Sequence, residues 1–290
     1  MEMPVASGCV RGKIYHGTMS VGTTYADLGC TRSLISLFTA FWYVPGMRIA
    51  ILSDIHGNLE ALTSVLADLD ATTPPVAEIV SLGDVVGYGP DPEACVRLVR
   101  ARGMLCVTGN HELGVARAKY RRWFNPQSRE ALKRTCELVS PETVEWAAAL
   151  PVSVERHGAL FVHGLPPDSA LRYLYELEAS GLVELFSTYP HAVAFVGHTH
   201  ELEHVEWDGT SITRHPLGVG SLVLNHAHRH IINVGAVGQP RDGDRRAKYV
   251  LWDTETWELV VRFVPYDVET TVRKFKEAGM PQRYADRLLA

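Results

Sequence analysis

The chain has 290 residues, of which 46% are hydrophobic and 21% are charged. This is the composition of a folded globular protein, and it excludes a disordered, collagen-like or coiled-coil chain. The formal net charge of −5 and the lack of any run of lysines and arginines count against a long track for nucleic acid. Five scattered cysteines without a CxxC pair favour a reduced, cytoplasmic protein.

Residues 1–46 differ from the rest of the chain because they lack a clear amphipathic period. Their apolar run, Leu34 to Val44, is too short to span a bilayer, which needs about 20 residues. Pro45-Gly46 follows that run instead of a small-residue cleavage site, which disfavours a signal peptide. We therefore predict an N-terminal extension over 1–46, disordered or due to a misassigned start, and a single domain over 47–290. No membrane contact is expected.

From Met47 onward, short apolar runs alternate with amphipathic helices in the order strand, helix, strand, helix, strand. The strands are predicted at 48–52, 78–82 and 104–108. Asn58 and Asp91 are the predicted N-caps of the two intervening helices. Near-continuous apolar strands in this order predict parallel pairing in a sheet that is buried on both faces.

The remaining elements indicate a second, β-rich half. Helices are predicted at 112–122, 128–149 and about 170–186, and again at about 268–278 and 282–289. A hairpin is predicted from 152–156 and 159–162, followed by a strand at 193–196. Further short strands are predicted at 202–207, 211–215, 222–224, 230–234, 247–253 and 258–264. Two sheets with helices outside them are the simplest assembly.

Polar side chains follow five of the buried strands, at the point where each strand ends. They are Asp54, His56, Asp84, Asn110, His163, His198 and His200. Because ligands bind beyond the carboxyl ends of strands in open α/β sheets, we expect these side chains to converge on one crevice. One catalytic ion takes about three or four protein ligands, so the set predicts two divalent ions that share a carboxylate. The absence of thiolates favours Mn²⁺, with Fe, Zn²⁺ or Ni²⁺ as alternatives, over copper.

The motifs SDIHGN, GD, GNHE, a later HG and GHTH occur in this order from Ser53 to His200. The set resembles the calcineurin-like metallophosphoesterase superfamily, with a match from Met47 to about Pro265. The SDIHGN motif and the segment NVGAVGQPRDG from Asn233 resemble its compact bacterial branch, which includes phosphodiesterases, phosphatases and diadenosine tetraphosphate hydrolases. The resemblance implies a four-layer αββα sandwich, an α/β (α+β) fold of two mixed sheets flanked by helices, with the metal site at the carboxyl ends of the strands.

The resemblance also implies roles for individual residues. Asp54, His56 and His200 would bind one metal ion, Asn110, His163 and His198 the second, and Asp84 would bridge both. His111 would be the catalytic histidine that binds no metal. As an imidazolium, it would neutralise charge on the phosphoryl oxygens or protonate the leaving alkoxide.

The chain departs from many relatives at Gly87, where they place an aspartate that orients the catalytic histidine. What orients His111 is therefore open, with Tyr88 and Glu112 as alternatives. Tyr88, Asn58 and Arg241 are also weaker candidates for substrate binding. A guanidinium in the glycine-rich loop at Arg241 suits bidentate phosphate contact, although an ordinary surface arginine fits equally well.

The remaining histidines give weaker signals. His226, His228 and His230 alternate, so we expect them to share one strand face that is exposed to solvent, with a further metal site as the alternative. His204 and His215 have no partner at a useful spacing.

The predicted function is a dinuclear metal-dependent phosphoesterase in which a metal-bridging hydroxide attacks a small phosphorylated substrate. Nucleotides and dinucleoside polyphosphates are among the candidates, and neither ester type, native metal nor oligomeric state follows from the sequence. A phosphoprotein phosphatase and a non-catalytic binding protein on the same fold are the alternatives, and nucleic acid is a disfavoured partner. The segments 112–150, 166–190 and 236–246 are expected to set specificity.

Overall fold

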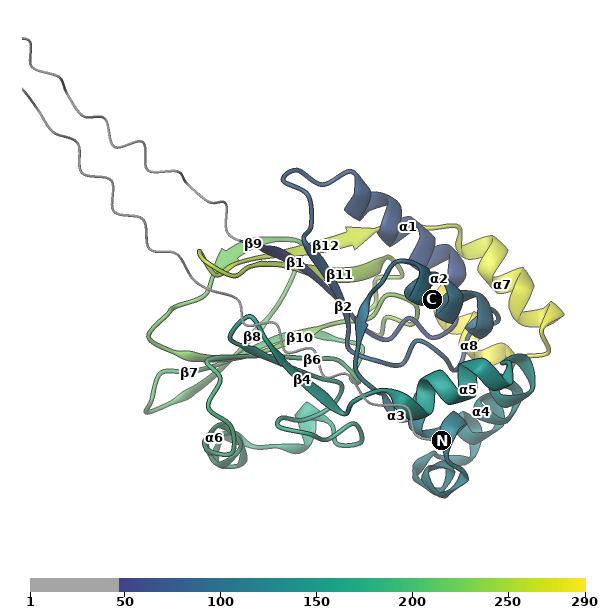
Figure 1. The fold of residues 1–290 in the computed structure, drawn as a ribbon, viewed down its shortest axis with the longest axis horizontal. Coiled ribbons are helices and arrows are strands. Elements are labelled where there is room, and N and C mark those ends of the chain that lie inside the picture. The colour runs from purple at the N-terminus through teal and green to yellow at the C-terminus, as the bar shows by residue number, and fades with distance from the viewer. Residues whose placement is uncertain (1–46) are drawn as a thin grey trace, which may run out of the picture. The chain divides into compact units, whose positions relative to one another are not determined.

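The computed structural model describes residues 47–290 (Figure 1). They form two mixed sheets of six strands each, packed face to face, with helices outside them. The predicted sandwich of two mixed sheets flanked by helices is confirmed. The predicted extension over 1–46 lies outside the described residues, and the single domain over 47–290 stays a prediction.

The first sheet has the strand order β3-β2-β1-β11-β12-β9. β1 pairs in parallel with β2, and β2 with β3, as the alternation of strands and helices predicts. β11 runs antiparallel to β1, and β12 and β9 complete the sheet in antiparallel pairs. The strands are β1 (Arg48–Leu52), β2 (Glu78–Ser81), β3 (Leu105–Cys106), β9 (Gly220–Val223), β11 (Ala247–Asp253) and β12 (Glu258–Val264).

The second sheet has the strand order β4-β5-β6-β10-β7-β8. β4 and β5 form the predicted antiparallel hairpin, and β5, β6 and β10 are parallel to one another. The carboxyl ends of β5 and β6 therefore meet at one edge of this sheet. The strands are β4 (Ser153–Arg156), β5 (Ala159–Val162), β6 (Val193–Val196), β7 (Leu202–Trp207), β8 (Ile212–Pro216) and β10 (Arg229–Val234).

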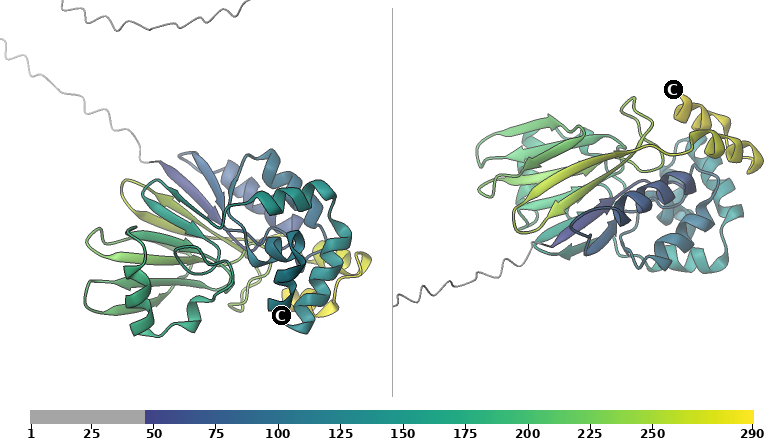
Figure 2. Two further views of the ribbon diagram at one scale, coloured as in Figure 1. Left: turned by 60° about the horizontal axis from the view of Figure 1, so that its bottom comes forward. Right: turned by 90° about the horizontal axis from the view of Figure 1, so that it is seen from above.

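One helix, α6, lies on the outer face of the second sheet, whereas most of the others gather at the right-hand end of the sandwich in Figure 1, as the views of Figure 2 also show. α1 packs on β11, β12 and α7, whereas α6 packs on the second sheet beside β8. No helix in residues 47–290 is long and apolar enough to cross a membrane. The α-helices are α1 (Leu59–Asp70), α2 (Pro92–Ala101), α3 (Asn110–Ala116), α4 (Pro126–Leu138), α5 (Pro141–Ala149), α6 (Ala179–Ser187), α7 (Val268–Glu277) and α8 (Gln282–Leu289), and the 3-10 helices are η1 (Ala118–Trp123) and η2 (Leu174–Glu176).

The predicted long helix over 128–149 is wrong, because α4 and α5 are separate helices. Pro141 disfavours helical geometry at the residue before it, and Ser140 instead caps α5 by accepting a hydrogen bond from the Thr143 N–H at 3.2 Å. The helix predicted at 112–122 is likewise divided into α3 and η1, and that at 170–186 into η2 and α6.

The two predicted helix caps differ. The Asn58 side chain caps α1 by accepting a hydrogen bond from the Ala61 N–H at 3.1 Å. The Asp91 side chain makes no capping hydrogen bond, because its carboxylate pairs with Lys274 Nζ at 2.9 Å. Asp91 therefore ties α2 to α7 instead of capping α2.

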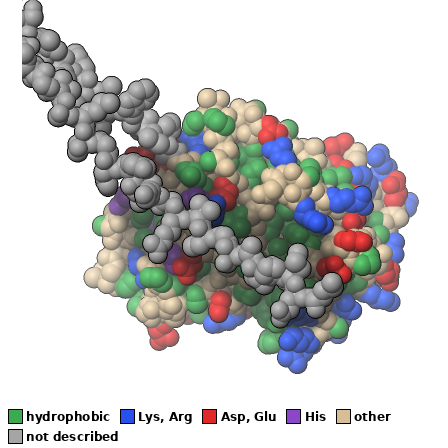
Figure 3. All heavy atoms as spheres, in the orientation of Figure 1, with side chains coloured by type: hydrophobic (Ala, Val, Ile, Leu, Met, Phe, Trp, Pro, Cys, Tyr) green, Lys and Arg blue, Asp and Glu red, His purple; other side chains and the backbone are tan. Residues whose placement is uncertain are grey.

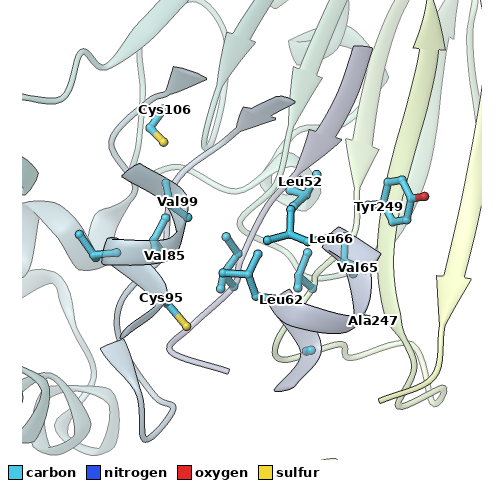
Figure 4. Close-up of a cluster of buried hydrophobic side chains, with 14 of the residues drawn as sticks. Leu52, Leu62, Val65, Leu66, Val85, Cys95, Val99, Cys106, Ala247 and Tyr249 are labelled. Atoms are coloured by element: carbon cyan, nitrogen blue, oxygen red, sulfur yellow. The ribbon is translucent and has the colours of Figure 1, made fainter. Parts of the chain in front are cut away.

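Buried apolar side chains on both faces of the first sheet hold its strands in place. Leu52, Leu62 and Tyr249 belong to the layer between the first sheet and its helices (Figure 4). Phe195 and Trp252 belong to the layer between the two sheets, where their ring centroids are 5.2 Å apart. A buried side chain of this kind contributes about 1.5–3 kcal/mol, so the strand ends that carry the polar residues are firmly positioned.

Candidate metal centre

The seven predicted metal ligands lie just beyond the carboxyl ends of β1, β2, β3, β5 and β6. Six of them are at most 4% exposed, and only Asn110, at the start of α3, is partly exposed. The six are Asp54, His56, Asp84, His163, His198 and His200. Packing thus brings these side chains into one buried group.

A first set of ligand atoms gathers around Asp54. Its Oδ1 atom lies 3.4 Å from His56 Nε2 and 3.3 Å from His200 Nε2. The two ring nitrogens are 3.2 Å apart, and Asp54 Oδ1 has no hydrogen-bond partner among the described residues. All three ligand atoms lie within 4.8 Å of one another, which suits one divalent cation.

A second set gathers around His163. Its Nε2 atom lies 3.1 Å from Asn110 Oδ1 and 3.1 Å from His198 Nδ1. Asp84 Oδ2 is 3.3 Å from the same nitrogen and 3.7 Å from His56 Nε2. One carboxylate oxygen of Asp84 therefore faces both sets.

The other ring nitrogen of three of these histidines is anchored on the backbone. Nδ1 of His56 donates to Val86 O at 3.1 Å, and Nδ1 of His163 donates to Leu82 O at 2.9 Å. Nδ1 of His200 donates to Gln239 O at 2.6 Å. Because Nδ1 carries a proton in each case, Nε2 is the atom available to a cation, which is the usual arrangement at metal sites.

The backbone is strained at this group. Left-handed backbone costs an L-residue about 1–2 kcal/mol, and it persists only where the surroundings impose it. Five of the seven residues adopt it, namely Asp54 (φ 53°), His56 (48°), Asp84 (52°), His198 (69°) and His200 (66°). Strain concentrated on residues with metal-binding side chains indicates a functional site.

Neighbouring groups hold the two carboxylates in place. Ser53 Oγ and the His198 N–H donate to Asp54 Oδ2 at 2.7 and 2.9 Å. The Gly109 backbone passes so close to Asp84 that a Cβ there would lie 2.1 Å from Oδ1. Ser53 was not among the predicted site residues, and its only signal in the sequence is its position beside Asp54.

The charges of the group are interdependent. Burial opposes the charge of Asp84, but neighbouring histidines, with His163 as the largest contributor, outweigh this effect and lower the pKa of Asp84 well below its usual value. Burial also opposes charge on His163, yet Asp84 raises the pKa of His163 to about 9. The protonated ring thus supplies a positive charge of the kind that a bound cation would supply.

His111 lies beside the carboxylate of Asp84, because the backbone N–H of His111 donates to Asp84 Oδ1 at 2.8 Å. Both ring nitrogens are buried and have no hydrogen-bond partner among the described residues. Burial lowers the pKa of His111 to about 3 despite the negative charge of Asp84. The expected imidazolium is therefore disfavoured in the free protein, and the ring is neutral near pH 7.

Packing orients the His111 ring. The ring lies 4.4 Å from the Tyr88 ring and 4.9 Å from the Phe124 ring, measured between centroids. A Cβ on Gly87 would lie 2.0 Å from His111 Nδ1, so the imidazole occupies the space that a side chain at that position would need. Glu112 does not contact the ring by hydrogen bonding. Its carboxylate accepts the N–H groups of Asp84, Val86 and Gly109 at 2.7, 3.0 and 2.9 Å and so fixes the loop.

The three candidate substrate-binding residues occupy different places. Arg241 is beside the metal centre, where its backbone N–H donates to the backbone oxygen of His200 at 3.3 Å. Tyr88 is 7% exposed, and its hydroxyl lies 3.3 Å from Ser128 Oγ. Its ring packs against the His111 ring, so Tyr88 is a buried packing residue. Asn58 is 1% exposed and uses its amide to cap α1 and to bind Gly238 O at 3.0 Å, so it is not brought to the surface of the centre.

The segment 166–190, expected to affect specificity, places two tyrosines at the centre. The Tyr173 ring stacks on the His198 ring at 3.7 Å, and the Tyr175 ring stacks on Tyr173 at 4.8 Å. Tyr175 is 64% exposed. Neither tyrosine was singled out, because nothing in their local sequence places them beside His198.

A second group of histidines lies away from this centre, and we call it the outer histidine cluster. Only His230 of the three alternating histidines lies in β10, so the shared strand face is wrong. His228 bonds Glu206 at 2.7 Å, and His226 stacks on Trp257. The expectation that His204 and His215 lack partners is also wrong, because neighbouring strands supply them. The cluster comprises His204, Glu206, His215, His228 and His230.

Comparisons of this chain with known proteins indicate one protein family. Residues 47–257 match the model of the calcineurin-like phosphoesterase superfamily domain. An uncharacterised protein of Methanocaldococcus jannaschii is 32% identical over 83% of this chain and 96% of its own length. A metallophosphoesterase structure from Sphaerobacter thermophilus is 34% identical, with a TM-score of 0.73 over 84% of this chain and 99% of its own.

A symmetrical bis(5'-nucleosyl)-tetraphosphatase of a Janthinobacterium strain is 31% identical over 56% of this chain and 59% of its own length. The match of the family model spans most of the chain and includes every residue of the metal centre described above. The chain therefore belongs to the calcineurin-like phosphoesterase superfamily and is a metal-dependent phosphoesterase.

Proposed function

We propose that the protein is a dinuclear phosphoesterase that hydrolyses a small phosphorylated substrate. Its ligand groups are Asp54, His56 and His200 for one cation and Asn110, His163 and His198 for the other, with Asp84 shared. The position of Asp84 Oδ2 carries the proposal, since it is 3.7 Å from His56 Nε2 and 3.3 Å from His163 Nε2. One oxygen so placed serves both ligand groups.

The donor atoms fit divalent cations. When bound, such ions polarise a phosphoryl group and lower the pKa of water toward neutrality. The set contains only carboxylate, amide and imidazole donors, which favours Mn²⁺, with Fe, Zn²⁺ or Ni²⁺ as alternatives. The chain contributes by holding these donors rigid through the backbone hydrogen bonds of His56, His163 and His200.

His111 is the proposed catalytic group outside the ligand set. A ring nitrogen of His111 lies within 4.8 Å of ligand atoms of His56 and Asp84. A neutral imidazole carries one N–H, and neither ring nitrogen of His111 is engaged elsewhere among the described residues. The N–H is therefore free to donate to a phosphoryl or leaving-group oxygen.

Small phosphorylated molecules fit the surroundings better than nucleic acid does. Acidic and basic side chains are interspersed on the face drawn in Figure 3, without an extended basic track. Tyr173 and Tyr175 offer a flat aromatic surface next to His198, of a kind that stacks on nucleobases. Together with the similarity to a nucleosyl-tetraphosphatase, this makes nucleotides and dinucleoside polyphosphates the first substrates to screen.

The test is hydrolysis of bis-p-nitrophenyl phosphate and of p-nitrophenyl phosphate by metal-stripped protein resupplied with Mn²⁺. We expect Mn²⁺-dependent turnover with two equivalents of metal bound. Asp84→Asn should lose metal and lower kcat/KM by at least about 10³-fold. Asp70→Asn, which removes a carboxylate on the surface that pairs with Arg102, is the matched control. Full turnover by metal-free protein, or two bound equivalents and full turnover in Asp84→Asn, would contradict the proposal.

A further inference from the structure

We propose that Arg241, Arg245 and Arg287 form a second anion subsite, which binds a further phosphate group of the same substrate. The inference rests on the proposed function, because the metal centre would bind the phosphate that is hydrolysed. It extends that function by assigning the substrate at least two phosphate groups.

The three arginines line one cavity of about 350 Å³. The loop after β10 supplies Arg241 and Arg245, and α8 supplies Arg287, at the end of the molecule where α7 and α8 pack together (Figure 2). Gln239 Nε2 donates to Tyr284 O at 3.2 Å and so joins this loop to α8. The volume is within the range of pockets that hold small ligands, about 300–1,000 Å³.

Arg241 connects this cavity to the metal centre. The backbone N–H of Arg241 donates to the backbone oxygen of His200, and Gln239 O in the same loop accepts from His200 Nδ1. Burial and then the charge of Arg241 lower the pKa of Arg287, which lies across the cavity. The loop that supplies Arg241 is thus joined by two hydrogen bonds to a ligand of the proposed metal centre and lines the cavity that it shares with Arg287.

None of the three arginines has a carboxylate within 4.0 Å among residues 47–290, and Arg241 Nε is buried without a hydrogen-bond partner. Other cations of the same loop are paired. Arg246 Nε lies 3.0 Å from Asp244, and Lys248 Nζ lies 2.7 Å from Asp242. Asp244, the one acidic side chain in the lining, is therefore already bound by Arg246.

Three unpaired guanidinium groups around one cavity repel one another unless an anion joins them. Guanidinium groups bind phosphate oxygens in pairs of parallel hydrogen bonds, which makes phosphate the matching ligand. The cavity adjoins the metal centre through Arg241, so a phosphate linked to the reacting one fits better than an independent ion. This juxtaposition points to a phosphoanhydride or a bisphosphate as the substrate class.

The first test titrates the protein, at fixed free Mn²⁺, with inorganic pyrophosphate and with orthophosphate by calorimetry. Wild type should bind pyrophosphate at least about 10-fold more tightly, and Arg245→Ala and Arg287→Ala should each weaken pyrophosphate about 10-fold. Arg273→Ala removes an exposed arginine of α7, which pairs with Glu277, and should change nothing. Equal affinities for the two anions in wild type, or unchanged pyrophosphate affinity in both cavity variants, would overturn the subsite.

The second test asks whether the subsite belongs to the substrate. At fixed free Mn²⁺, pyrophosphate should inhibit hydrolysis of bis-p-nitrophenyl phosphate competitively, and Arg287→Ala should raise its inhibition constant about 10-fold more than that of orthophosphate. Non-competitive inhibition would overturn the shared substrate. If pyrophosphate binds wild type as expected but no phosphoester is hydrolysed, the proposed function fails while the anion subsite stands.

Discussion

The metal centre and the outer histidine cluster are both rich in histidine and both contain a carboxylate, yet their geometry differs. Within residues 47–290, every set of three or more metal-ligand atoms lying within 4.8 Å of one another belongs to the metal centre. The outer cluster lies toward the opposite end of the second sheet, where His230 is the second residue of β10 and lies opposite Glu206 of β7. Histidine content alone therefore does not produce a metal site.

The difference lies in how the polar atoms are satisfied. In the outer cluster, His204 Nε2 is 2.9 Å from His230 Nδ1, and Glu206 Oε1 accepts from His228 at 2.7 Å. In the metal centre, Asp54 Oδ1 has no hydrogen-bond partner among the described residues, and five residues adopt left-handed backbone. The metal centre therefore differs from the outer cluster in two ways that suit a bound cation. A buried carboxylate oxygen in it lacks a hydrogen-bond partner among the described residues, and its ligand residues have strained backbone.

The largest expected effect separates the clusters directly. His163→Ala should reduce bound metal and lower kcat/KM by about 10³-fold, because its Nε2 faces Asn110, His198 and Asp84. His204→Ala should leave metal content and kcat/KM within about 3-fold of wild type. Elemental analysis and steady-state kinetics check both variants. Loss of the metal in His204→Ala would show that the two clusters are coupled.

A smaller effect concerns two glycines with the same backbone conformation. Gly87 has φ 93° and Gly209 has φ 94°, so alanine strains both positions equally. A Cβ at Gly87 would meet His111 Nδ1 at 2.0 Å, whereas nothing lies within 4 Å of one at Gly209. Gly87→Ala should displace the ring and lower kcat about 100-fold.

The Gly209→Ala variant serves as the control for backbone strain. It should lose stability to a similar extent without loss of kcat, because its side chain extends into open space. Thermal melts and initial rates measure the two quantities. Equal losses of kcat in the two variants would mean that backbone strain, and not contact with His111, explains the effect.

The smallest effect is a pH dependence in the outer cluster. Burial and the neighbouring His230 lower the pKa of His204 to about 4, whereas an unfolded histidine has a pKa of about 6.5. As the pH falls below about 6.5, His204 becomes protonated in the unfolded chain but stays neutral in the folded chain, so the free energy of unfolding decreases. Metal-stripped His204→Gln should lose about 1 kcal/mol less than wild type between pH 7 and pH 5. Urea unfolding at both pH values measures this difference, and identical losses in the two proteins would contradict it.

Much of the metal centre could be anticipated because its residues follow buried strands. A parallel sheet brings the carboxyl ends of its strands to one edge, so the position of Asp54 after β1 and of Asp84 after β2 implies their proximity. Ser53, Tyr173 and Glu112 could not be assigned in the same way. Their contacts join segments that are brought together only by packing, as when Glu112 binds the N–H of Val86.

Errors in the predicted elements have local and tertiary causes. Pro141 could have divided the helix over 128–149 by the rule for the residue before a proline. Asp91 had the composition of a cap, but Lys274 on α7 takes its carboxylate instead. His204 was assigned no partner because its neighbours, His215 and His230, come from other strands.

The sequence by itself determined the parallel order of the first strands, the family resemblance and the ligand types, because apolar runs and short motifs are local. Only the tertiary structure decided which atoms face each other. It placed Asp84 Oδ2 between two ligand sets, packed His111 against the bare Cα of Gly87 and joined the backbone of Arg241 to that of His200. These relations depend on sheet pairing and side-chain packing, which connect residues far apart in the chain and have no local signature.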